Sequence, residues 1–353
     1  MTYFTKIDQS VHPNYKLFKK NIFTTQKKLI LNKRIDNQII KDIIYNLKFN
    51  KKDSLFGGAW QNIDVSARKK LIISLNNQKN LRDKFSNFFR NSFSFGLISS
   101  HWEQKNKKNW ERDIISNILK NISAWEEFCM SSKIDYKYLD SKNDPGNPYG
   151  LNYKNNLILF DTPRHDYYAK KITNILRNCK DPLIIEIGGG YGGLLSQLLK
   201  RKFSFSYINI DLPQSLAVAY YYIKKKFNKK ILFSRKLKKI DLKKNKFIFM
   251  PFSNDIFDMP KLDTSLVFNS NSFSEMNKNI STKYFNLINK ILKPKYIMHQ
   301  NSNYLLYPDS KLHIEIQSSD FNIDYRNYNS IYSFPSIFQG GSGRYREYLF
   351  ERK

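Results

Sequence analysis

Apolar residues in the first third of the chain recur at intervals of three and four, which is typical of amphipathic helices. One such stripe follows Asp36, which we expect to cap the helix. A second stripe covers residues 81–89, and a third, about five turns long, covers residues 110–128. These stripes predict a helical N-terminal region over residues 1–145.

From residue 146 onward, short apolar runs alternate with amphipathic helical stripes. Alternating strands and helices fold into a doubly wound sheet, which binds its ligands at the carboxyl ends of the strands. We therefore predict an α/β domain over residues 146–353. Its expected strands are residues 183–185, 207–210, 247–251, 266–269, 295–301 and 344–350.

Glycine is concentrated at one place in this domain. The chain has only 13 glycines, and five of them lie within residues 188–193, between the first predicted strand and the following helix. Glycines there let the backbone turn sharply and approach a ligand, and the helix N-terminus offers free N–H groups. Asp211 ends the second strand, where an acid can accept both hydroxyls of a ribose. The pattern predicts a site for a nucleoside cofactor.

Glu186 distinguishes between two cofactors. Gly188, Gly190 and Gly193 fit the G-x-G-x-x-G pattern of dinucleotide sites, so NAD is one alternative. However, Glu186 lies inside an apolar strand, where an unpaired charge is costly. With Gly188, Gly190 and Gly192 it forms E-x-G-x-G-x-G, which resembles motif I of class I S-adenosylmethionine (SAM) methyltransferases. In that motif the acid faces the charged methionine end of SAM.

An ordered set of motifs is similar to the sugar O-methyltransferase family, class I enzymes associated with bacterial surface polysaccharides. The matching stretches are residues 147–150, 164–169, 186–193, 211–213 with 219–222, 269–276 and 343–348. The resemblance implies a class I methyltransferase Rossmann-like doubly wound sheet with a helical N-terminal extension, which by analogy forms a substrate lid. It also implies SAM as the cofactor and a sugar, nucleotide-sugar or glycan as the acceptor.

The resemblance further implies the residues of the site. Cofactor binding is assigned to Glu186, Gly188, Gly189, Gly190, Gly192, Asp211, Leu212 and Asn269. Acceptor binding is assigned to Tyr149, Arg164, Tyr168, Asn271 and Arg344.

Methyl transfer to a sugar hydroxyl requires a proton acceptor near that hydroxyl. His299 leaves the fifth predicted strand and Glu275 follows the fourth, so both border the expected position of the methyl group. His165 begins the helix that we expect to cover the site. We rank His299 first, ahead of Glu275 and His165. No spacing of ligands supports a metal.

The net charge of +30 permits several partners. Its densest lysine run is residues 224–246, although the many Lys, Asn and Ile residues also fit the composition of an AT-rich genome. We interpret the run first as a solvated face and second as a patch for peripheral contact with an anionic membrane or a polyanion. No RNP or C₂H₂ signature accompanies it, so nucleic acid is the less favoured partner.

Two other functions stay open: methylation of RNA or a small metabolite, and a non-catalytic basic scaffold. The second would leave Glu186 and Asp211 without a role. The N-terminus lacks the apolar stretch of a signal peptide, and no apolar run approaches 18 residues. We expect the protein in the cytoplasm.

Overall fold

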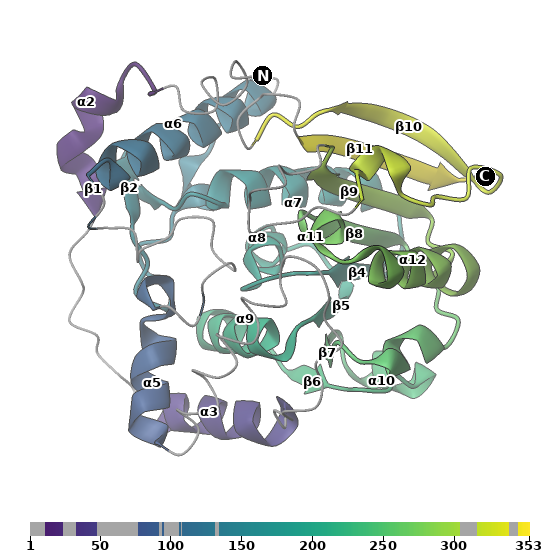
Figure 1. Cartoon of the computed structure of the whole chain (residues 1–353). Coiled ribbons are helices and arrows are strands. Elements are labelled where there is room, and N and C mark those ends of the chain that lie inside the picture. The colour runs from purple at the N-terminus through teal and green to yellow at the C-terminus, as the bar shows by residue number, and fades with distance from the viewer. Residues whose placement is uncertain are drawn as a thin grey trace.

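The computed structural model describes residues 11–23, 33–47, 77–91, 94, 106, 108–130, 134–303, 316–338 and 345–353. A sheet of eight strands runs through the centre of this part of the chain (Figure 1). The strands are β4 Leu183–Ile187, β5 Ser206–Asp211, β6 Ile231–Phe233, β7 Phe247–Pro251, β8 Leu266–Ser270, β9 Tyr296–Ser302, β10 Tyr328–Pro335 and β11 Tyr345–Arg352. Their order across the sheet is β10-β11-β9-β8-β4-β5-β7-β6.

The sheet grows in two directions from β4. The chain passes from β4 to β5 and β7 on one side, and then returns to place β8 and β9 on the other. These five strands are parallel, whereas β11 is antiparallel to β9 and β10 is antiparallel to β11. The reversal creates a topological switch point between β4 and β8, the position at which open α/β sheets bind ligands.

Helices cover both faces of the sheet (Figure 1). One face carries α7 Thr162–Leu176, α8 Gly193–Lys200 and α9 Pro213–Phe227. The other carries α10 Lys239–Lys244, α11 Ser272–Glu275, α12 Lys278–Asn286 and the π-helical turn η7 Leu287–Leu292. Because both faces are covered, every residue of β4 and β7 is buried. This burial explains the uninterrupted apolar runs in the sequence.

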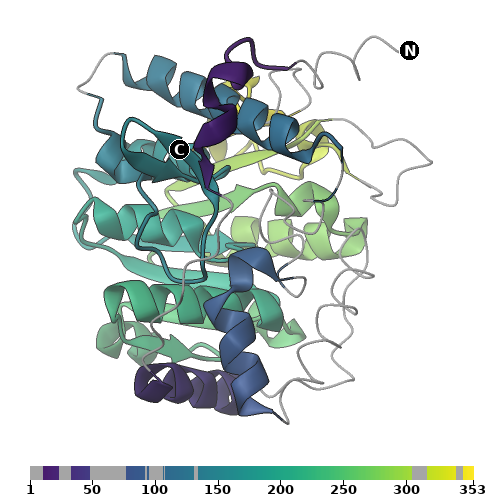
Figure 2. The same ribbon diagram turned by 90° about the vertical axis from the view of Figure 1, so that its left-hand side faces the viewer.

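The N-terminal elements form a further layer outside α7, α8 and α9 (Figure 2). They comprise α2 Tyr15–Phe18, α3 Lys33–Leu47, α5 Gln78–Ser86, the 3-10 turn η2 Phe88–Arg90 and α6 Trp110–Cys129. A small sheet joins β1 Ile22–Phe23, β2 Gly150–Tyr153 and β3 Asn156–Ile158. Other 3-10 turns are η1 Lys19–Asn21, η5 Tyr136–Leu139, η6 Asn254–Asp258 and η8 Ser318–Asp320. None of the described helices is long and apolar enough to cross a membrane.

The described N-terminal helices share one hydrophobic core with the sheet. Ile115 of α6, Ile172 of α7 and Phe268 of β8 belong to the same buried cluster. Strand β1 also pairs with β2, so hydrogen bonds cross the boundary that the sequence predicts at residues 145 and 146. That boundary stays a prediction, but it does not separate two hydrophobic cores.

Several elements differ from the sequence prediction. Helix α3 begins at Lys33, so Asp36 lies in its first turn and is fully buried; its predicted role as the cap was wrong. The pattern also gave no sign of β6, because this edge strand has only three residues and lies inside the lysine run. Strand β10 was missed because most of its residues are exposed and it has no continuous apolar run.

A row of tyrosines explains the motif at residues 219–222. Three consecutive tyrosines of α9 each donate a hydrogen bond to an aspartate from earlier in the chain: Tyr220 to Asp42 at 3.0 Å, Tyr221 to Asp36 at 3.1 Å and Tyr222 to Asp144 at 2.6 Å. Two of these aspartates lie on α3 and the third lies in the turn-rich segment before β2. Helix α9 therefore fastens two N-terminal segments to the sheet domain.

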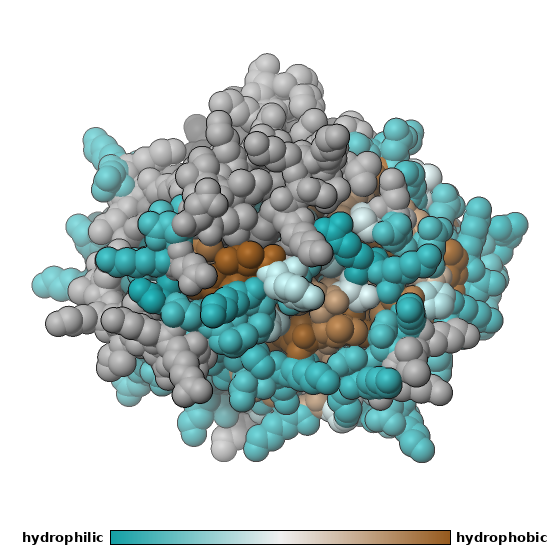
Figure 3. All heavy atoms as spheres, turned by 90° about the horizontal axis from the view of Figure 1, so that it is seen from below, coloured by the Kyte–Doolittle hydropathy of each residue, from teal (hydrophilic) through white to brown (hydrophobic). Residues whose placement is uncertain are grey.

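The lysine run is only partly a solvated face. Lys225 forms an ion pair with Asp36, and Lys226 forms one with Asp144. Other basic residues of the run are exposed: Lys230, Arg235, Lys236, Lys238, Lys244 and Lys246. Seen from the side of α3 and β6, hydrophilic side chains cover much of the described surface, with apolar patches between them (Figure 3). The solvated-face interpretation thus fails for Lys225 and Lys226, because buried aspartates recruit them.

Candidate active site

The glycine loop joins β4 to α8 in a conformation that few other residues adopt. Gly188, Gly190 and Gly192 have φ angles of 76°, 57° and 84°, in the left-handed region. The Gly188 N–H donates to the Ile210 carbonyl at 2.8 Å, which ties the loop to β5. The loop therefore turns over the carboxyl ends of β4 and β5, where a doubly wound sheet binds nucleosides.

Asp211 ends β5 beside this loop. Its Oδ2 accepts a hydrogen bond from the Gly190 N–H at 2.7 Å, and its Oδ1 accepts one from the Leu212 N–H at 2.6 Å. Leu212 is the extended residue that precedes α9. The backbone thus orients a half-buried carboxylate at the open end of the strand, where a ribose hydroxyl would be recognised.

Glu186 lies beneath the loop and is 4% exposed. Its Oε2 has no hydrogen-bond partner among the described residues. Burial raises the pKa of Glu186 to about 8, and the charge of Asp211 adds to this rise while Arg164 opposes it. A carboxyl group in such a place is costly to ionise unless a cation joins it. The geometry therefore fits a ligand with a positively charged end.

The N-terminus of α7 connects to the switch point through Arg164. This buried guanidinium donates to the Ser270 hydroxyl through Nη1 and to the Asp161 carboxylate through Nη2, both at 3.0 Å. Ser270 in turn donates to Gln300 Oε1 at 2.8 Å. Arg164 therefore places a positive charge next to the ends of β8 and β9.

Asn269 is engaged within the protein. Its amide group donates to the Ile187 carbonyl at 2.7 Å, and its Oδ1 accepts from the Asn301 amide at 2.9 Å and from the Phe273 N–H at 3.3 Å. These bonds hold the ends of β4 and β9 and the start of α11 around the switch point. Cofactor binding by Asn269 stays a prediction, whereas its positioning of these three ends is visible.

Asn271 and Glu275 flank α11 just beyond the switch point. Asn271 has a φ of 70°, which is uncommon for a residue with a side chain, and its Oδ1 is buried without a hydrogen-bond partner in the described part of the chain. Its N–H donates to the Gln300 carbonyl at 2.7 Å. Glu275 is half-buried at the other end of the helix. Both occupy the region where the sequence predicts the acceptor.

His299 lies in the aromatic core on the α11 and α12 face. Its side chain is 1% exposed, with ring centroids 4.6 Å from Tyr348 and 5.1 Å from Phe321. Neither ring nitrogen bonds to a described residue, and burial lowers its pKa to about 3. Strand alternation places His299 on the same face as Ile297, which the sequence analysis did not weigh. This environment favours a packing role over proton transfer.

His165 lies in the first turn of α7 and packs on the glycine loop. A Cβ added at Gly193 would lie 2.2 Å from its ring, and its Nδ1 is 3.4 Å from the Tyr191 hydroxyl. Burial and the charge of Arg164 lower the pKa of His165 to about 3, although Asp161 opposes this shift. The imidazole is therefore neutral and only weakly basic at physiological pH.

Three further residues were predicted to bind the acceptor, and one of them lies outside the described chain. Tyr149 is buried, with the guanidinium carbon of Arg90 5.5 Å from its ring centroid. Tyr168 packs against Phe268, and its hydroxyl has no hydrogen-bond partner among the described residues. Arg344 lies outside the residues that the structure describes. These assignments stay predictions.

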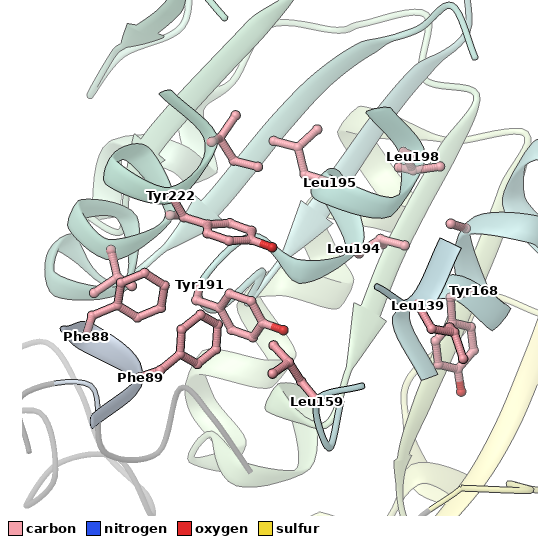
Figure 4. Close-up of a cluster of buried hydrophobic side chains, with 14 of the residues drawn as sticks. Phe88, Phe89, Leu139, Leu159, Tyr168, Tyr191, Leu194, Leu195, Leu198 and Tyr222 are labelled. Carbon is pink, nitrogen blue, oxygen red and sulfur yellow. The ribbon is translucent and has the colours of Figure 1, made fainter. Parts of the chain in front are cut away.

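An aromatic cluster joins the glycine loop to the N-terminal layer. Tyr191 of the loop meets Phe89 at 5.4 Å, Tyr222 at 5.5 Å and Phe88 at 6.3 Å between ring centroids. Figure 4 shows these four rings gathered between η2, the loop and α9. The N-terminal layer therefore supports the loop directly.

Asn209 of β5 lies beside Glu186 of β4 and was not predicted from the sequence. It is fully buried, and neither of its amide atoms has a hydrogen-bond partner among the described residues. The available signal was a polar residue between Ile208 and Ile210 in an otherwise apolar strand. It has the same character as the signal that identified Glu186.

No protein-family model and no curated protein sequence matches the chain. Solved structures do. The small RNA methyltransferase HEN1 matches at 18% identity and a TM-score of 0.40, over 54% of this chain and 25% of that one. The methyltransferase domain of a bacterial Hen1 matches at 13% identity and a TM-score of 0.38, over 53% of this chain and 97% of that domain. Magnesium protoporphyrin IX methyltransferase from Synechocystis, with bound S-adenosylhomocysteine, matches at 9% identity and a TM-score of 0.38, over 67% of this chain and 96% of that one.

The chain spans about a quarter of the length of HEN1. At TM-scores of 0.40 and below, these matches assign no activity to the chain. The strand order of the sheet itself defines the fold. The central strands lie in the order β7-β5-β4-β8-β9. Numbered along the chain from β4 and without the edge strand β6, this is 3-2-1-4-5, the order of nucleotide-binding folds. Strand β11, antiparallel to its neighbours, separates β9 from β10, and β10 runs in the same direction as β9. This arrangement is a Rossmann-like, doubly wound α/β fold.

Proposed function

We propose that this protein is a SAM-dependent methyltransferase that methylates a sugar hydroxyl. The observation that carries the proposal is Glu186, a buried carboxyl group beneath the glycine loop with one oxygen that has no hydrogen-bond partner among the described residues. The amino acid end of SAM bears an ammonium group that offsets the cost of ionising this residue. NAD has no such amino acid end. Glu186 therefore favours SAM over NAD.

The residues of the chain divide the work of binding. Asp211, held by Gly190 and Leu212, would accept the ribose hydroxyls, and the glycine loop would hold the cofactor with its backbone. SAM supplies the electrophilic methyl group when it is bound. What the protein must add is alignment of the acceptor hydroxyl with that methyl and removal of one proton.

Glu275 is our first candidate for the proton acceptor. It is half-buried after β8, close to the switch point, where a carboxylate can take the hydroxyl proton. His165 is second, because it lies beside the loop but has a strongly lowered pKa. His299 becomes third, because aromatic rings enclose it. Asn271, with its buried Oδ1, is proposed to orient the acceptor hydroxyl.

The ordered motifs support a sugar, nucleotide-sugar or glycan as the acceptor. A second candidate is RNA, which the net charge of +30 and the exposed basic residues around β6 and α10 favour. Transfer of a labelled methyl group from SAM to nucleotide sugars and to RNA separates the two. Labelling of RNA with no labelling of any sugar would overturn the sugar proposal and leave the methyltransferase proposal intact.

Calorimetry with three ligands tests the cofactor. We expect the wild-type protein to bind SAM and S-adenosylhomocysteine and not to bind NAD. Asp211→Ala should weaken S-adenosylhomocysteine by about 1.5–3 kcal/mol, which is the scale of a hydrogen bond to a charged group. Binding of NAD without binding of SAM would contradict the proposal.

A further inference from the structure

A row of buried side chains crosses the sheet beneath the glycine loop. On the face that α7, α8 and α9 cover, it comprises Phe249, Asn209, Glu186, Phe268 and Met298 on five adjacent strands. Each of them is 4% exposed or less. The outer three are apolar and pack in one core cluster. The two polar members are neighbours, and they lie on the two strands that the loop crosses.

Within this row, Asn209 is the residue that packing alone does not explain. Its Oδ1 and Nδ2 are both buried without a hydrogen-bond partner in the described chain, as is Oε2 of Glu186. A hydrogen bond between the two side chains would satisfy only one atom of the amide, because asparagine offers both an acceptor and donors. Burying the other atom is costly, and an apolar residue such as Phe249 avoids that cost.

The two side chains converge on the loop backbone. A Cβ built on Gly189 would lie 2.7 Å from Oδ1 of Asn209, 2.8 Å from its Nδ2 and 2.8 Å from Oε2 of Glu186. Gly189 therefore rests directly on a carboxyl group and an amide that face the same place. Arg164 and Asp211 are the charged residues whose fields act on Glu186. The cluster combines acceptors, a donor and a nearby positive charge.

We propose that Asn209 acts with Glu186 as a recognition residue for the α-amino acid end of the cofactor. This inference rests on the proposed function. An ammonium group has three N–H donors, and the Glu186 carboxylate and Asn209 Oδ1 together accept two of them. The Asn209 Nδ2 group donates to the carboxylate of the same amino acid. The adenosine end of the cofactor presents neither charge and gains nothing from Asn209.

The variant Asn209→Leu tests this proposal with two ligands. S-adenosylhomocysteine has the amino acid end, and 5′-methylthioadenosine has the same nucleoside and thioether without it. We expect Asn209→Leu to weaken S-adenosylhomocysteine by about tenfold or more in calorimetry and 5′-methylthioadenosine by less than about twofold. The ligand-free variant should also melt at a higher temperature than wild type, because it buries no unpartnered amide.

Tyr207→Phe is the matched control. Tyr207 lies two residues earlier on the same face of β5, is fully buried, and has a hydroxyl without a hydrogen-bond partner among the described residues. Its variant should leave both affinities unchanged. If Asn209→Leu folds poorly, the affinities for S-adenosylhomocysteine and 5′-methylthioadenosine are compared in Asn209→Ser instead, and the larger loss is again expected for S-adenosylhomocysteine.

Two results would overturn the role of Asn209 while leaving the proposed function intact. One is unchanged affinity of the variant for S-adenosylhomocysteine, and the other is an equal loss for both ligands, which would mean that Asn209 only supports the loop. A wild-type protein that binds neither ligand would instead contradict the proposed function itself.

Discussion

At the scale of single residues, the candidate site is marked by buried polar groups that have no hydrogen-bond partner within the described part of the chain. Glu186 is the clearest, since burial and Asp211 raise its pKa to about 8. Sequence alone located it, because a charge inside an apolar strand stands out. The same reasoning applied to Asn209 would have found the second member. The role of His299 as the base stays a prediction, although alternation along β9 places its side chain among the rings of Phe321 and Tyr348.

Glu186 should make stability fall as the pH rises. Its folded pKa of about 8 lies above the ordinary value of 4.5, so the folded protein binds more protons between these values. The contribution of protonated Glu186 to the free energy of unfolding is fully present below pH 4.5. It is lost as the pH rises toward 8, by up to about 1.4 kcal/mol per pH unit. Urea unfolding of Glu186→Gln should show greater stability than wild type at pH 8, and the difference should shrink toward pH 5.

The exposed Glu127 provides the control for that experiment. Glu127→Gln should follow the wild-type stability at every pH. A constant difference between Glu186→Gln and wild type from pH 5 to pH 8 would mean that Glu186 titrates normally.

Variants of Glu275 and His299 test which of the two residues accepts the proton and which only packs in the aromatic core. Glu275→Gln should lower kcat by roughly 10²–10⁴ with little change in SAM affinity. His299→Leu roughly keeps the volume of the buried ring and removes two nitrogens that bond to no described residue, so it should retain kcat and at least wild-type stability. Turnover assays with SAM decide between them. Loss of turnover in His299→Leu with full activity in Glu275→Gln would return the role to His299.

At the scale of elements, α9 does more than cover the sheet. Its tyrosines and two lysines bind aspartates from α3 and from the segment before β2. The amphipathic pattern predicted this helix and the strands around it, because burial on two faces leaves a strong signal. It could not predict β6 or β10, since short or half-exposed edge strands lack a continuous apolar run.

Lys226 should matter for stability, unlike its exposed neighbours in the run. It forms a largely buried ion pair with Asp144 and donates to Ser196 Oγ at 3.0 Å. Lys226→Gln leaves Asp144 buried without its cation, so we expect a loss of about 3 kcal/mol in urea unfolding. The exposed Lys230→Gln should stay within about 0.5 kcal/mol of wild type. Equal stability of the two variants would contradict the docking role of Lys226.

At the scale of the whole molecule, the N-terminal layer and the sheet domain form one packed body in the described chain. The rings of Phe88 and Phe89 support Tyr191 of the glycine loop, and α6 shares its core with α7. A sequence pattern defines helices and strands but not which of them share a core. For this reason the boundary at residue 146 is a change in pattern more than a break in packing.

Shared packing predicts a single unfolding transition. All four tryptophans lie before residue 146, so their fluorescence reports on the N-terminal region, whereas far-ultraviolet circular dichroism reports on the whole chain. The two signals should change at the same urea concentration. An earlier fluorescence transition would show that the N-terminal layer unfolds independently.

If Glu186 receives the cationic end of SAM, cofactor binding at neutral pH should release a proton. At pH 7, Glu186 with a pKa of about 8 is mostly protonated in the free protein and must ionise to pair with an ammonium group. Calorimetry of S-adenosylhomocysteine binding in buffers of different ionisation enthalpy should show release of nearly one proton by wild type and none by Glu186→Gln. Equal proton release by the two proteins, or none by wild type, would mean that Glu186 does not pair with the ammonium group.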